Sequence, residues 1–166
     1  LQFIDDKILV KGLKRIILRD IKWESLLKYI RRDICIRIID KKEYINHIEL
    51  QFIMAIAEQC FMNEYIYSQH NQEKKLIEKL ITKCQNNDTN IQSISILACY
   101  IPLHEILSCV KSIKLLARNI SDKSFEELIN LQLLEPEKEI EISKKIKRIG
   151  SINDLISKKV KSQYEE

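Results

Sequence analysis

The stretch that decides the fold runs from His47 to Tyr67 and reads HIELQFIMAIAEQCFMNEYIY. Its apolar residues occupy more than one side of a helix, and a helix that is hydrophobic most of the way round is a buried, central one. Four polar residues lie in its last turns: Gln59, Asn63, Glu64 and Tyr65. If packing continues around them, these side chains need hydrogen-bond partners inside the core. We therefore predict a spine helix that ends in a buried polar network or in a docking surface.

Two amphipathic segments precede this stretch. From residue 23 to residue 38, apolar residues recur at intervals of three and four, and Asp20 stands where a helix N-cap belongs. The opposite face carries basic residues that we expect to face water, namely Lys22, Lys28, Arg31 and Arg32. A similar pattern spans residues 6–19, with Gly12 inside it. Together the two segments predict a first helical hairpin.

Helical patterns also follow the spine. Residues 72–84 place leucine and isoleucine on one face of a helix. The other face carries Glu73, Lys74, Lys75, Glu78 and Lys79, which we expect to point outward. After a polar loop, residues 91–100 form an apolar pattern that ends before Pro102. Residues 104–119 fit either one short helix or two pieces.

The C-terminal region carries clear helix boundaries. Ser124 and Glu127 have the spacing of a capping box. Pro136 opens a further helix that Gly150 stops, and residues 152–164 set their apolar residues on a single face. The whole chain, residues 1–166, therefore predicts one all-α domain of about seven to nine helices, packed as antiparallel pairs around the buried central helix.

Composition and charge exclude several classes of protein. Only two glycines and two prolines occur in 166 residues, which excludes a glycine-fingerprint nucleotide fold within this sequence. The formal net charge of +4 is too small an excess to predict a nucleic-acid partner by itself. No apolar run reaches the roughly 18–20 residues of a membrane span, and the N-terminus lacks the features of a signal peptide. We expect a soluble, cytoplasmic protein without a membrane partner.

Five cysteines without a secretory signal predict reduced, mostly buried thiols. The spacing of Cys99, His104 and Cys109 matches three ligands of a zinc knuckle, but Ile96 stands where the first cysteine belongs. Structural zinc takes four ligands, so we predict no metal site. We also predict no cofactor.

Two other functions remain open as alternatives. The lysine-rich stretches 144–148 and 158–161 leave a small nucleic-acid-binding protein as the second alternative, but interleaved acidic residues make a solvated face the simpler interpretation. A helical enzyme is the outside alternative, with a site built from His47, Glu64 and His104. Because no nucleophile stands beside a base in a recognisable motif, we predict no catalytic residues in this chain.

Three blocks of the sequence resemble a known protein region. They are AEQCFMNEYIY at residues 57–67, preceded by Arg31-Arg32-Asp33, then ACYIPL at residues 98–103, and INDLISKKVKSQYEE at residues 152–166. In this order they are similar to the helical region between the tetratricopeptide repeats and the S-adenosylmethionine-dependent methyltransferase domain of large bacterial fusion proteins, chiefly from alphaproteobacteria.

The resemblance implies a non-catalytic interaction or regulatory module. It also implies a piece of, or a remnant from, a longer methyltransferase-associated protein. The glycine-rich loop and the acidic ribose-binding residue of a methyltransferase are absent from this sequence, so no cofactor-binding residue carries over. The implied partner is protein, namely the tetratricopeptide repeats or the methyltransferase domain, in the same chain or in another. A homo-oligomer is also compatible with the sequence.

Overall fold

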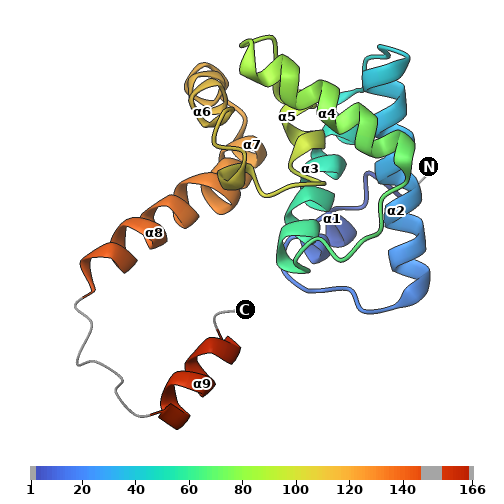
Figure 1. The fold of residues 1–166 in the computed structure, drawn as a ribbon. Helices are drawn as coiled ribbons and strands as arrows, with labels where there is room; N and C mark the ends of the chain where they lie inside the picture. The colour runs from blue at the N-terminus through green and yellow to red at the C-terminus, as the bar shows by residue number, and fades with distance from the viewer. Residues whose placement is uncertain (1–2, 147–154, 165–166) are drawn as a thin grey trace.

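The computed structural model describes residues 3–146 and 155–164, and within these ranges it contains helices and no strand (Figure 1). The α-helical segments are α1 (Lys7–Leu13), α2 (Ile21–Cys35), α3 (His47–Met62), α4 (Asn71–Gln85), α5 (Ile91–Leu97), α6 (Val110–Asn119), α7 (Lys123–Ile129), α8 (Glu135–Lys145) and α9 (Leu155–Tyr164). Two π-helical segments, η1 (Ile36–Asp40) and η3 (Asn130–Leu134), continue α2 and join α7 to α8. A short 3-10 helix, η2 (Leu103–Glu105), precedes α6. The predicted all-α class is confirmed.

Helix α3 is the buried spine of the fold, as predicted, but it ends at Met62 and does not continue to Tyr67. It begins at a capping box, in which Asn46 accepts from the Glu49 N–H and Glu49 accepts from the Asn46 N–H. Every residue from Phe52 to Cys60 is buried. Helices α1, α2, α5 and α7 pack around this helix (Figure 1). Because each buried large aliphatic side chain contributes roughly 1.5–3 kcal/mol, these contacts dominate the core.

Two predictions for the N-terminal region are wrong. Helix α1 ends at Leu13 and does not continue to residue 19. It packs chiefly against α3, so the predicted hairpin with α2 is not the packing unit. Gln59 of α3 supplies the physical reason. With its amide nitrogen facing the end of α1, it donates to the carbonyls of Ile16 (2.8 Å) and Leu13 (3.2 Å), groups that a longer helix bonds internally.

The chain from residue 123 to residue 145 is one long helical element, where two separate helices were predicted. Asp122, not Ser124, caps its start by accepting from the Phe125 N–H. Pro136 lies in the first turn of α8, directly after the π-helical η3. The π-helical η3 therefore carries the chain from α7 into α8 without a break.

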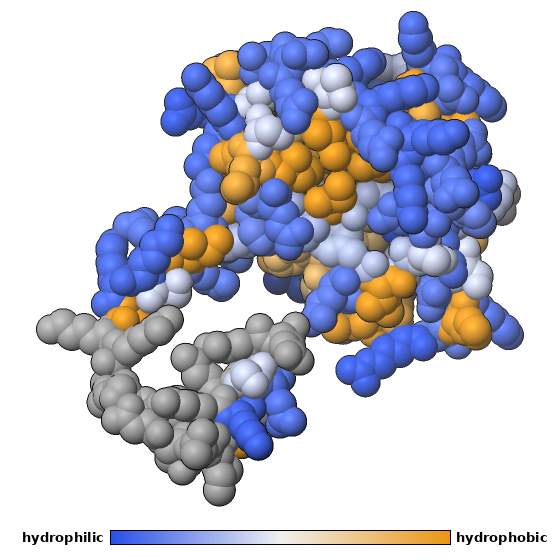
Figure 2. Space-filling view, viewed as in Figure 1, coloured by the Kyte–Doolittle hydropathy of each residue, from blue (hydrophilic) through white to orange (hydrophobic). Residues whose placement is uncertain are grey.

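Helix α8 extends away from the packed helices as an arm (Figure 1). None of its residues is buried, and Ile140 and Ile142 are exposed. Hydrophobic surface is visible on this arm in the space-filling view (Figure 2). The predicted stop at Gly150 lies outside the described residues.

Residues 104–119 form two pieces, the end of η2 and helix α6. None of the described helices is both long enough and apolar enough to cross a membrane.

Candidate functional site

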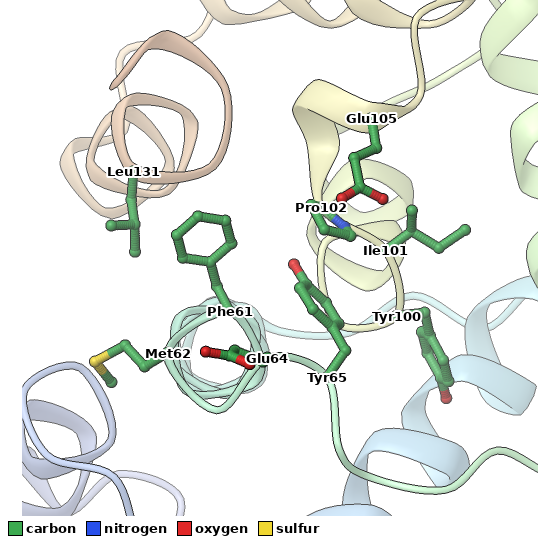
Figure 3. Close-up of a pocket in the computed structure, with 9 residues that line it drawn as sticks. All are labelled: Phe61, Met62, Glu64, Tyr65, Tyr100, Ile101, Pro102, Glu105 and Leu131. Carbon is green, nitrogen blue, oxygen red and sulfur yellow. The ribbon is translucent and has the colours of Figure 1, made fainter. Parts of the chain in front are cut away.

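A cleft opens at the C-terminal end of α3, between that helix, the segment after α5, and η3 (Figure 3). Its volume of about 730 Å³ falls within the range of ligand-binding pockets. The lining residues are Phe61, Met62, Glu64, Tyr65, Tyr100, Ile101, Pro102, Glu105 and Leu131. They are mostly apolar, they include two carboxylates, and none of them is basic. The cleft is therefore complementary to a ligand that is both apolar and positively charged.

The backbone that ends α3 holds two of the lining side chains in a strained conformation. Glu64 and Tyr65 have φ angles of 56° and 58°, in the left-handed region. This region costs a non-glycine residue roughly 1–2 kcal/mol, and strain of this kind collects at functional sites. The turn is closed by the Tyr65 N–H, which donates to the Cys60 carbonyl at 2.9 Å. As a result, Glu64 and Tyr65 stand at the cleft and do not continue the helix (Figure 3).

Gln132, a buried residue of η3, fixes the wall of the cleft around Tyr65. Its amide nitrogen donates to the carbonyls of Ala57 (2.9 Å) and Ala98 (3.1 Å). Its amide oxygen accepts from the Tyr65 hydroxyl at 3.0 Å. Burial raises the pKa of Tyr65 well above its ordinary value, so its hydroxyl stays protonated and serves as a donor. One amide thus joins α3, the end of α5 and η3.

A second polar cluster, around Arg31 of α2, adjoins the cleft through Tyr100. Arg31 and Glu73 were predicted to face water, and this is wrong, because each is 1% exposed. The guanidinium lies 3.6 Å from the Glu73 carboxylate, donates to the Ser68 carbonyl at 2.9 Å, and stacks 4.2 Å from the centre of the Tyr100 ring. The Tyr100 hydroxyl donates to Glu73 at 2.7 Å. In Figure 3 this hydroxyl points away from the cleft, so the cluster supports the cleft from behind.

The structure divides the four predicted network residues between different roles. Gln59 bonds the end of α1, and Tyr65 bonds Gln132. Asn63 is buried, and its amide atoms reach no hydrogen-bond partner among the described residues. Glu64 is exposed at the cleft. The buried hydrogen-bond network and the exposed surface of the cleft therefore meet within one turn of the chain.

Three residues that shape the cleft were missed by the sequence analysis: Arg31, Glu73 and Gln132. Arg31 and Glu73 lie on the polar side of their helical patterns, where periodicity alone assigns water. For Glu73 the sequence does contain an indication, because Glu73 stands three residues after His70, the spacing of a capping box. In the structure it accepts from the His70 N–H at 2.7 Å. No pattern in the sequence indicates that Gln132 is buried.

The histidine-based alternative site does not assemble. His47 begins α3 and Glu64 follows its end, so the length of a 16-residue helix, about 24 Å, separates them. His104 lies near the cleft, with its ring edge-on to Phe61 and its Nδ1 atom 3.2 Å from the Gln132 carbonyl oxygen. These three side chains therefore do not converge on one reacting atom.

All five cysteines are buried and free, as predicted. Burial raises the pKa of Cys60 to about 11 and those of Cys35 and Cys84 to about 12, which is opposite to the shift that activates a nucleophile. The Cys99 thiol donates to the Ser95 carbonyl at 3.3 Å. Within residues 3–146 and 155–164, no three metal-ligating side chains come together.

The lysine-rich stretches are described in part. Lys145 lies 2.6 Å from Glu141, which offsets its charge, and residues 147 and 148 fall outside the described ranges. Lys159 in α9 is exposed.

A scan against protein-family models, a search of curated proteins and a search of solved structures each found no match for this chain.

Proposed function

We propose that this chain is a non-catalytic helical interaction module that binds a protein partner through the cleft at the end of α3. The observation that carries the proposal is the cleft itself, whose apolar walls bear Glu64 and Glu105 and no basic side chain. A helix that presents apolar side chains flanked by lysine or arginine matches it in both respects.

The contacts that hold the walls of the cleft in place favour a binding role over a purely structural one. The strained turn holds Glu64 and Tyr65 at the cleft, Gln132 bonds the Tyr65 hydroxyl, and the Arg31 cluster supports Tyr100 from behind. A site with fixed walls loses little conformational freedom when it binds, and more of the contact energy is then available for affinity.

The association with a methyltransferase is part of the proposal and comes from the resemblance. Two of the resembling blocks, residues 57–67 and 98–103, supply most of the cleft lining. We propose that the module works in the cytoplasm beside an S-adenosylmethionine-dependent methyltransferase. It would hold a tetratricopeptide array and the catalytic domain in register, or cover the mouth of the active site. Titration of the full chain with S-adenosylmethionine should give no heat, and a clear binding curve would contradict the non-catalytic assignment.

The partner chemistry is tested with two synthetic amphipathic peptides that differ only in charge, one of leucine and lysine and one of leucine and glutamate. Fluorescence anisotropy with the full chain should show binding of the lysine peptide alone, weakening as salt is added. The E64Q/E105Q variant should bind it about 2- to 30-fold more weakly, since two exposed ion pairs contribute ~0.2–1 kcal/mol each.

The matched control is E78Q/E139Q, which removes the same charge from exposed positions outside the cleft and should leave the affinity unchanged. Equal binding of the two peptides would refute the proposed partner chemistry.

A further inference from the structure

Helix α9 is a short, basic helix. Its ten residues include three lysines and no acidic residue. Those of its side chains that the structure describes are exposed, with Val160 at 46%. Isolated helices shorter than about 12–15 residues are marginal in water. Contact with an apolar, negatively charged surface would therefore stabilise α9.

The cleft at the end of α3 is such a surface, and it lies within reach. About 14 residues separate Leu131, which lines the cleft, from Lys145 at the end of α8, a helical rise of at most about 21 Å. The nine residues 146–154 span up to about 30 Å when fully extended. The chain is therefore long enough for α9 to return to the cleft of its own molecule.

Resting on the proposed function of the cleft, we propose that α9 is its internal, tethered ligand. The lysines of α9 approach Glu64 and Glu105, and Val160 contacts the apolar wall that includes Phe61. Tethering keeps α9 at a millimolar effective concentration, so it competes with an outside partner. The apparent affinity for that partner falls by the fraction of molecules in which the cleft is open.

The test uses the full chain and the leucine–lysine peptide as the outside partner. Reversing the charge of α9 with K158E/K159E/K161E should strengthen peptide binding by about 3- to 30-fold, because α9 then leaves the cleft. The matched control is K74E/K75E/K79E, which reverses three exposed lysines on α4 and should not increase the affinity. V160D keeps the lysines and tests the apolar contact. Like the charge reversal, V160D should strengthen peptide binding.

Hydrogen exchange supplies a second measurement on the same proteins. Amides of residues 61–65 and 100–105 should exchange more slowly in the wild type than in the α9 variants.

The outcomes separate this inference from the proposed function. Equal peptide affinity in the wild type and both α9 variants overturns the tethered ligand, while the proposed function stands if E64Q/E105Q still weakens binding. Failure of every variant to bind the peptide overturns the proposed function as well. A wild-type dimer that becomes a monomer on reversal of the α9 charge shows that α9 occupies a second copy, which overturns the intramolecular contact.

Discussion

Replacement of Arg31 by methionine tests whether the cluster behind the cleft holds the fold together. The Arg31 guanidinium donates to the carbonyls of Ser68 at 2.9 Å and Cys99 at 3.4 Å, and it lies 3.6 Å from the Glu73 carboxylate. R31M leaves the Glu73 carboxylate buried without this cation. Removing one partner of a buried ion pair costs about 3–5 kcal/mol, against about 5–15 kcal/mol of total stability for a domain of ordinary size. We therefore expect R31M to lose a fifth or more of its free energy of unfolding.

The assay is urea denaturation followed by circular dichroism, with the free energy of unfolding obtained by linear extrapolation. The neighbouring variant R32M is the control, because Arg32 is half-buried and lies outside this cluster, and it should change the stability by about 0.5 kcal/mol or less. The double variant R31M/E73Q should lose about 1–3 kcal/mol less than the sum of the single losses, since the two side chains interact. A loss below about 1 kcal/mol for R31M, or an additive double variant, would refute the reasoning.

Three further predictions follow from contacts at other positions. Burial alone raises the pKa of Glu49, but hydrogen bonds from Arg37 and the backbone hold this pKa below 4.5. The free energy of unfolding should therefore fall as the pH drops below 4.5, and it should fall less in E49Q than in the wild type. E64G should raise the free energy of unfolding by up to about 1 kcal/mol by relieving the left-handed residue, and a loss instead would mean that this side chain stabilises the fold. Q132L should lower the free energy of unfolding by about 2 kcal/mol and the Tm by about 4–8 °C, because it removes the hydrogen bonds of the Gln132 amide to Ala57, Ala98 and Tyr65; a Tm within about 2 °C of the wild type would contradict this role.

Helix starts were predictable where one capping residue stands alone. Asp20 caps α2 as expected, accepting from the N–H groups of Lys22 and Trp23. At the start of α7 two candidates stand two residues apart, and the structure uses Asp122 where Ser124 was expected. Both positions satisfy the local spacing rule, so only the packing of the following helix distinguishes them.

Periodicity predicted the faces of the helices correctly except where a second helix covers the polar side. On α4, Lys74 and Lys75 are exposed as expected, while Glu73 beside them is buried against Arg31 of α2. A helical pattern reports which side of one helix is apolar. It does not report where a neighbouring helix brings an opposite charge, and that pairing is what made burial of these two side chains tolerable.

The candidate site could be predicted in part. The polar turn at the end of α3 was identified, and Glu64 and Tyr65 line the cleft. The other walls come from segments far away in the sequence, Tyr100 to Glu105 and Leu131, which only the tertiary fold brings to this turn. The π-helical geometry that places Gln132 beside them has no sequence signature comparable to a cap.

The π-helical turn between α7 and α8 also determines where the arm points. Each residue of an α-helix advances the chain by about 100° around the axis, and a π-turn accommodates residues that a regular α-helix of the same length does not. Loss of a single codon between Asn130 and Leu134 would therefore turn the face that α8 presents by about 100° around the helix axis. Gln132 and Leu133 of the same turn are buried, so only a deletion that keeps these two side chains in the core would change this face without disturbing the domain that carries the arm.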